Sequence, residues 1–260
     1  MRQARVRDMD DIGVGVPVAM PLPPDPELVG EVIQHASVTR GEGLRYARRE
    51  VAKDRNATLV AVLTVLKMLA IPRTEEVLAK LLLLPGGDKI ECGPGCSACC
   101  NQNVEVSIPE AILVSLQVAD PADPRREAVL ETAIAVAGLS QGDRMLCGRP
   151  CPFLVDDKCS VYENRPLVCR ATFSPYRQGC LDVLKGKTSA LIYPLPQFFG
   201  QGYKDALRGI CKDLGLQYDN VELVQTVATI LRDPSTVVRW AAGERVFTPL
   251  PLNPPLPDRC

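Results

Sequence analysis

Two cysteine-rich stretches organise the chain: Cys92-Gly-Pro-Gly-Cys96-Ser-Ala-Cys99-Cys100, and Cys147-Gly-Arg-Pro-Cys151-Pro-Phe-Leu-Val-Asp-Asp-Lys-Cys159, which continues through Arg165-Pro166-Leu167-Val168 to Cys169-Arg170. Eight of the 11 cysteines fall between Cys92 and Cys169. Short spacings bring thiols together at little entropic cost of loop closure, which suits a metal ion or a cluster. We therefore interpret this window first as a metal site.

Composition restricts the classes of function. The chain has 260 residues, 46% hydrophobic and 23% charged, with a net charge of -1, as in an ordinary globular protein of one or two domains. The charge balance and the 5% aromatic content predict neither nucleic-acid nor membrane binding. Because the first 20 residues lack an apolar core of signal-peptide length, we expect a cytoplasmic protein. Thiols stay reduced there, so many cysteines indicate metal binding or redox work.

The flanks of the cysteine window predict helices. Apolar residues recur at helical spacing in residues 27–84, and again beyond Tyr203, where Cys211 adjoins a stripe and is expected to be a structural thiol. We expect a mainly α fold, with helical flanks packed around a loop-rich, cysteine-ligated metal core and little or no sheet. The expected organisation is a Pro-rich arm at 1–26, a helical segment at 27–90, the cysteine core at 91–182, a second helical segment at 183–247 and a Pro-rich tail at 248–260.

Several local signals set the expected boundaries. Ser107 and Glu110 form a capping box at the start of a helix. Asn220 and Ser235 are predicted N-caps of two later helices, and Asp156-Asp157-Lys158 is a predicted turn between Cys151 and Cys159. Ile134 and Ala137 are expected to face inward on the helix that follows Asp123-Pro124. The single histidine, His35, is more typical of a surface or core residue than of a ligand or base.

The spacing of the cysteines bears on the kind of metal. Cys96-x2-Cys99 has the loop spacing that holds zinc or iron. Neighbouring side chains on an extended segment point apart, so Cys99 and Cys100 would face different metals, whereas on a turn both can reach one polynuclear cluster. One tetrahedral ion would leave at least four of the eight cysteines unused. Three nearby cations, Lys158, Arg165 and Arg170, either offset the charge of the thiolates or are solvated surface charges.

The combined motif resembles the YkgJ-type cysteine-cluster family of zinc- or iron-chelating domains, and flagellin lysine methylases carry a similar cluster. The resemblance rests on Cys92-x3-Cys96-x2-Cys99-Cys100 and on Cys151-Pro-Phe-Leu, Cys159-Ser-Val-Tyr-Glu-Asn-Arg-Pro-Leu-x-Cys169-Arg170, and it covers residues 91 to 180. The first spacing departs from many relatives, which have two intervening residues. Relatives often carry a further cysteine after the Cys-Arg element, and Cys180 would be its equivalent. The resemblance implies metal binding without fixing a reaction.

These observations lead to one favoured hypothesis and two rivals. The favoured hypothesis is an iron–sulfur cluster that serves electron transfer or modification of a partner protein, because the thiol surplus exceeds one zinc site. The rivals are a structural Zn2+ module for protein–protein interaction, with two zinc ions or with one zinc and spare thiols, and a thiol redox sensor or metal carrier. The candidate ligands are Cys92, Cys96, Cys99, Cys100, Cys151, Cys159 and Cys169, with Cys147 and Cys180 in reserve. No methyl-donor site, P-loop or dinucleotide fingerprint accompanies them.

Overall fold

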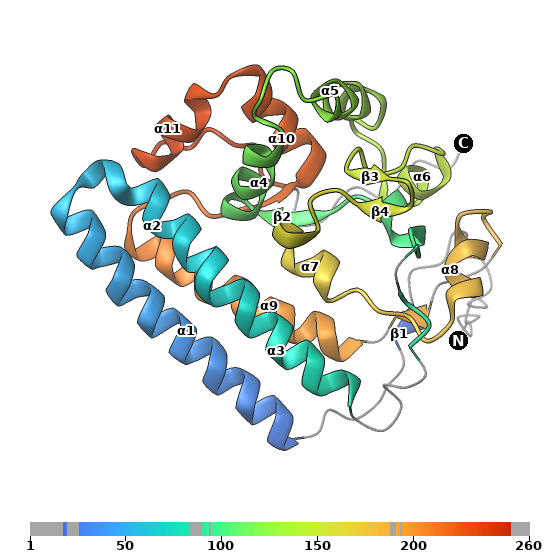
Figure 1. Ribbon diagram of the computed structural model, residues 1–260, viewed down its shortest axis with the longest axis horizontal. Helices are drawn as coiled ribbons and strands as arrows, with labels where there is room; N and C mark the ends of the chain where they lie inside the picture. Colours follow the sequence, from blue (N-terminus) through green and yellow to red (C-terminus); the bar gives the residue numbers. More distant parts are fainter. Residues whose placement is uncertain are drawn as a thin grey trace, which may run out of the picture.

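The computed structural model describes residues 18–19, 26–83, 90–93, 95–187, 191–192 and 194–250 (Figure 1). This part of the chain is mainly helical, as the sequence predicts, and its sheet content is three two-stranded pairs. β1 (Val18–Ala19) pairs in parallel with β5 (Leu191–Ile192). The antiparallel pairs are β2 (Glu105–Ser107) with β6 (Asn220–Glu222) and β3 (Leu154–Val155) with β4 (Lys158–Cys159). The rest of the predicted Pro-rich arm and the tail from residue 251 lie outside the described residues.

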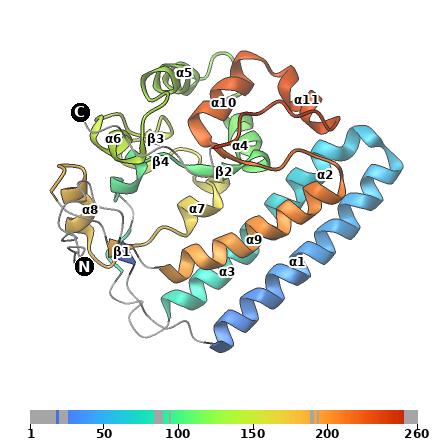
Figure 2. The same ribbon diagram turned by 180° about the vertical axis from the view of Figure 1, so that it is seen from behind.

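Helices from both flanks pack side by side into one layer, which we call the bundle (Figures 1 and 2). Its elements are α1 (Pro26–Lys53), η2 (Arg55–Ala57), α2 (Thr58–Val65), the π-helical turn η3 (Leu66–Ala70), α3 (Ile71–Leu82) and α9 (Pro194–Asp213). Buried Leu66, Leu207 and Ile210 join these helices in one apolar core. Gly43 lets α1 approach closely, because a Cβ there would lie 2.7 Å from Val65 Cγ1 and 2.8 Å from Ile210 Cδ1.

A second apolar core joins the middle of the chain to its C-terminal helices. The helices around it are α4 (Ile108–Ser115), η6 (Leu116–Val118), α5 (Arg125–Ala135), α10 (Leu223–Arg232) and α11 (Ser235–Ala241). α10 packs against α4 and α5, and the fully buried Trp240 donates its indole N–H to the Gln217 carbonyl oxygen at 2.8 Å. Helices from inside the cysteine window and from the C-terminal segment therefore share the interior of this second core.

The cysteines lie on short elements and loops between these two cores. These elements are η5 (Ala98–Asn101), α6 (Gln141–Leu146), η7 (Tyr162–Asn164), α7 (Leu167–Arg170), α8 (Arg177–Val183) and the hairpin β3–β4. We refer to residues 90–101 and 147–187 together as the cysteine layer. The loop-rich core expected from sequence is confirmed, and Cys211 is a fully buried thiol on α9, as predicted.

Two cap predictions and two burial predictions are wrong. Asn220 lies in β6, and the helix after it is capped by Glu222, whose carboxylate accepts from the Gln225 amide at 2.8 Å. Ser235 is the first residue of α11 rather than its cap, and it donates its own amide to Asp233 at 3.0 Å. Ile134 is 72% exposed and Ala137 is exposed too, because α5 buries a narrower face than its apolar pattern predicts and ends at Ala135. No helix in the described ranges combines the length and apolarity needed to cross a membrane.

Candidate metal centre

The doublet Cys99-Cys100 sits on a turn, which is the arrangement that lets both thiols face one region. Both residues lie in η5, where the Cys100 amide donates to the Ser97 carbonyl oxygen at 2.9 Å. The Cys151 amide donates to the Cys100 carbonyl oxygen at 2.7 Å. This bond brings the second cysteine stretch directly against the first, although about fifty residues separate them in sequence.

Three thiols pack against the second apolar core, and we call them the core-side thiols: Cys151, Cys159 and Cys169. Cys159 reaches this position through the hairpin β3–β4, where it pairs with Leu154. The turn predicted at Asp156-Asp157-Lys158 is confirmed for the two aspartates, whose φ angles of 50° and 58° are what a tight two-residue hairpin requires, whereas Lys158 begins β4. Ser97 donates its hydroxyl to Asp157 Oδ1 at 2.8 Å, which ties this turn to η5.

Cys169 is positioned by a buried carboxylate. Glu110, only 2% exposed, accepts from the Leu167 amide at 2.8 Å through Oε1, at the start of α7. Its Oε2 accepts from the Ser107 amide at 2.8 Å and from the Ser107 hydroxyl at 2.6 Å, so the capping box is confirmed. The Glu110 side chain thus caps the N-terminus of α4 and also holds the N-terminus of α7, the helix that carries Cys169.

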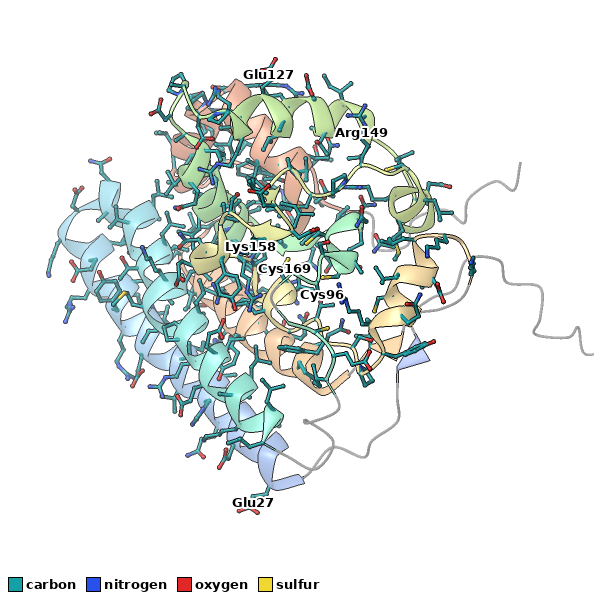
Figure 3. The ribbon with its side chains drawn as sticks, turned by 45° about the vertical axis from the view of Figure 1, so that its right-hand side comes forward. Glu27, Cys96, Glu127, Arg149, Lys158 and Cys169 are labelled. Atoms are coloured by element: carbon teal, nitrogen blue, oxygen red, sulfur yellow. The ribbon has the colours of Figure 1, made fainter. Side chains whose placement is uncertain are left out.

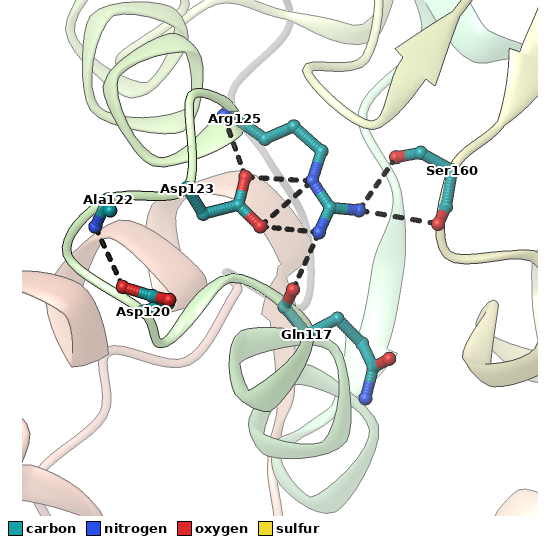
Figure 4. Close-up of polar contacts among 6 residues, drawn as sticks. All are labelled: Gln117, Asp120, Ala122, Asp123, Arg125 and Ser160. Carbon is teal, nitrogen blue, oxygen red and sulfur yellow. Dashed lines mark hydrogen bonds and ion pairs between the residues drawn. The ribbon is translucent and has the colours of Figure 1, made fainter.

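An arginine holds the chain just after Cys159 (Figure 4). Arg125 Nη1 donates to the Ser160 carbonyl oxygen at 3.3 Å and to the Ser160 hydroxyl at 3.2 Å. Asp123 orients the guanidinium, with an Nη2 to Oδ2 distance of 2.5 Å, and Nη2 also donates to the Gln117 carbonyl oxygen at 2.7 Å. The N-terminus of α5 is therefore anchored to the end of β4.

Three further thiols lie on the segments around Ser174, two on a loop and one in α8, and we call them the loop-side thiols: Cys92, Cys96 and Cys180. Ser174 donates its amide to Cys92 Sγ at 3.1 Å, and its side chain hydrogen-bonds the Cys180 thiol. A turn closed by a 3.0 Å bond from the Cys96 amide to the Gly93 carbonyl oxygen returns Cys96 toward Cys92. Figure 3 shows Cys96 and Cys169 next to each other near the middle of that view, close to Lys158 of the hairpin.

The electrostatics of the thiols identify which of them are neighbours. Burial is the largest cause that raises the pKa of Cys92, to about 11, and that of Cys151, to about 12. Repulsion from Cys96, Cys99 and Cys180 adds to the first shift, and repulsion from Cys159 adds to the second. Without a metal these thiols are therefore protonated at neutral pH, and metal binding would release their protons.

Cys99 is the thiol that the two groups share. Its hydrogen bond with Cys100 and then its burial raise its pKa far above the ordinary value. Burial is also the largest cause that raises the pKa of Cys169, and repulsion from Cys99 adds to it, as it does for Cys180 on the loop side. Cys99 therefore stands between the core-side and the loop-side thiols.

The cations near the thiols differ in part from those that the sequence suggests. Arg165 lies near enough to Cys99 to oppose the rise of its pKa, and its guanidinium stacks 4.1 Å from the Tyr162 ring centroid. Arg144, 1% exposed and not singled out by sequence, acts likewise on Cys151. Nothing in sequence periodicity marks a buried arginine on so short a helix.

Arg170 is neither a counter-ion of the thiols nor a solvated surface charge. It is 3% exposed, pairs with Glu75 of α3, and donates to the carbonyl oxygens of Tyr162, Glu163 and Arg165 at 3.2, 2.8 and 2.9 Å. This side chain therefore ties the cysteine layer to the bundle. The arginine of the Cys-Arg element is a structural residue.

Cys147 is placed apart from both groups in the contacts of the described residues. It is exposed, its thiol donates to the Arg144 carbonyl oxygen at 3.1 Å, and it lies 3.7 Å from Arg144 Nη1. Its role as a ligand stays a prediction. Cys260 lies outside the described residues.

The donor chemistry fits a soft metal. Several thiols from separate segments face one region, and thiolates select zinc, copper(I) or iron–sulfur clusters. Within the described ranges, no three His, Cys, Asp or Glu side chains are already arranged to hold one metal ion. Ligation thus needs rotation of half-buried cysteine side chains, which lie on loops and on short helices and strands.

A small cavity adjoins the centre between α7 and α9. Its volume is about 230 Å³, and Val168 and Ala171 line it on either side of Cys169 in sequence. Lys204, 5% exposed, also lines it, with Nζ 3.6 Å from Glu105 Oε1. The packing between the cysteine layer and the bundle is therefore incomplete beside α7.

Comparison with protein families agrees with this chemistry. Residues 91–187 match the family model CxxCxxCC, described as a "putative zinc- or iron-chelating domain". The match confirms the resemblance seen in the sequence and supports metal binding, with zinc or iron as the metal. No curated protein and no solved structure matches the chain.

Proposed function

We propose that this chain holds an iron–sulfur cluster through Cys99 and the core-side thiols, and that the cluster transfers electrons to or from a partner protein. The observation that carries the proposal is that three thiols, two from the hairpin segment and one from α7, pack on one core beside the Cys99-Cys100 turn. Four cysteines are the usual ligand set of a cubane or rhombic cluster. The family description, which allows iron, supports it.

The protein's own groups supply the position and the charge environment. Glu110 and Arg125 hold the segments that bear Cys169 and Cys159. The Arg165 and Arg144 guanidiniums offset the negative charge of the thiolates, which influences the reduction potential of a cluster. When bound, the cluster would supply one-electron chemistry. Half-buried thiols place it near the surface, as transfer to a protein partner requires, and a reducing cytoplasm is the compartment that suits it.

A structural zinc ion is the second candidate. The hairpin β3–β4 favours it, because its tight turn joins Cys151 to Cys159 and leaves little freedom between two ligands. In this case the metal only fixes the loops. The protein would then act through binding of a partner.

Metal analysis separates the two candidates. Protein purified without oxygen is measured for iron, zinc and acid-labile sulfide, together with its visible spectrum. We expect iron and sulfide in matching amounts in the wild type and in Cys211→Ala, whose thiol is fully buried among apolar side chains and has its pKa raised by burial alone. We expect both to be lost in Cys169→Ser. Zinc without sulfide would refute the cluster, and full metal content in Cys169→Ser would refute the ligand assignment.

A further inference from the structure

The loop-side thiols form a group that the cluster does not use. Cys92, Cys96 and Cys180 are absent from the cysteines that pack on either apolar core in the described residues, whereas all three core-side thiols pack on the second core. The two groups also come from different parts of the chain. The loop-side group joins residues 92–96 to α8, and the core-side group joins the hairpin to α7.

Backbone contacts fix the loop-side group independently of the cluster. The Glu91 amide donates to the Ser174 carbonyl oxygen at 3.1 Å, and the Arg177 amide donates to Glu91 Oε2 at 2.7 Å. The Cys180 amide closes the first turn of α8 on the Tyr176 carbonyl oxygen at 3.4 Å. Residues 90–92 therefore run beside 174–180, and Ser174 touches thiols on both sides, one of Cys92 and one of Cys180.

We propose that Cys92, Cys96 and Cys180 form a second metal site, separate from the cluster, which binds one thiophilic divalent ion such as Zn2+. Three thiolates are the protein ligands, so a tetrahedral ion would keep a fourth position for water or for an incoming ligand. All three thiols are partly accessible, which gives an ion a path to and from solvent. Cys99 lies near thiols of both sites, since it raises the pKa of Cys169 in one and of Cys180 in the other.

This proposal rests on the proposed function only in taking the neighbouring centre to be the iron–sulfur cluster. The test distinguishes a failure of the second site from a failure of the cluster. The full chain, purified without oxygen, is titrated with Co2+ as a coloured probe of thiolate ligation, and iron and sulfide are measured in the same samples. We expect the wild type to bind one Co2+ per chain with sulfur-to-cobalt charge-transfer absorption, in addition to iron and sulfide. The double variant Cys92→Ser/Cys180→Ser should lose the Co2+ bands and keep at least nine-tenths of its iron and sulfide.

The remaining outcomes decide between the alternatives. If Cys92→Ser/Cys180→Ser loses iron and sulfide together with the Co2+ bands while its helical circular dichroism is unchanged, all the thiols serve one centre and the proposal fails. If the double variant does not fold, the single variant Cys96→Ser is measured in its place and decides the question by the same criteria. If wild-type protein lacks iron but still binds Co2+ through Cys92 and Cys180, the second site stands and the cluster does not. Cys211→Ala should match the wild type in every measurement.

Discussion

The bundle buries apolar side chains along its length, whereas the cysteine layer is fixed mainly by polar side chains that bind the backbone. In the bundle, Leu66, Leu207 and Ile210 are at most 1% exposed and need no specific partner atoms. In the layer, positions depend on single groups such as Glu110 and Arg170, which satisfy backbone amides or carbonyls. Apolar packing tolerates small displacements, whereas a buried amide that loses its acceptor lowers the stability of the fold.

The contrast between the two regions indicates where a metal would contribute. The bundle has the apolar area to be stable by itself, since burial of apolar surface is the main favourable term in folding. The cysteine layer consists of three-to-seven-residue helices, two-residue strands and loops, so it needs added constraints. A metal bound across its segments would be such a constraint, because its binding free energy is available only to the folded arrangement.

The most damaging change should be removal of the Glu110 carboxylate. Glu110→Ala leaves the buried Ser107 and Leu167 amides without their acceptor, which costs about 1–3 kcal/mol for each amide. Chemical denaturation should show a lower free energy of unfolding, and elemental analysis should show metal loss. Glu110→Gln, which keeps one acceptor oxygen, should be intermediate. Unchanged metal content in Glu110→Ala would show that α7 does not position a ligand.

A substitution in the bundle should lower the free energy of unfolding slightly less than Glu110→Ala does, and it should leave the metal content unchanged. Ile210→Ala removes a fully buried side chain from the contact between α9 and α1, at a cost of about 2–5 kcal/mol. The folded fraction should keep its wild-type metal content. Equal loss of metal and stability in this variant would show that the two regions depend on each other more than their contacts indicate.

Arg170→Lys should weaken the link between the regions by roughly 1–3 kcal/mol. Lysine keeps the charge opposite Glu75 but cannot reach the three carbonyl oxygens of residues 162, 163 and 165. Metal release to a chelator should be faster than in the wild type. Arg239→Lys is the matched control, because Arg239 is an exposed arginine whose partner is Glu244. Equal release rates in both variants would contradict a structural role for Arg170.

A pH-dependent effect at Arg125 should be the weakest of these. The hydrogen bond from Arg125 holds the pKa of the Asp123 carboxyl below its ordinary value of 3.8. The pair therefore stabilises the folded state above pH 3.8, and this contribution is lost as the pH falls through the folded-state pKa of Asp123. The difference in stability between wild type and Arg125→Gln should be at most about 1 kcal/mol at pH 7. It should shrink below pH 3.8 in thermal unfolding, and a difference that grows on acidification would contradict this sign.

The sequence predicted much of this architecture for physical reasons that are local. Helical periodicity, the Ser107-Glu110 box and the Asp156-Asp157 turn each act over a few residues, and all three are confirmed. The division of the thiols and the placement of Arg170 depend on contacts across many tens of residues, with Ser174 and Glu75 as partners. No spacing rule encodes those contacts. The caps at Asn220 and Ser235 failed because an acidic residue nearby, Glu222 or Asp233, took the accepting role instead.

Hydrogen–deuterium exchange of the full chain, before and after removal of its metal by a chelator, would show whether a metal holds the cysteine layer together. We predict that amides of η5, the hairpin β3–β4 and α7 lose protection when the metal is removed, whereas those of α1, α2 and α9 keep theirs. Unchanged exchange in the cysteine layer after the metal has gone, or an equal loss of protection in both regions, would contradict this role for the metal.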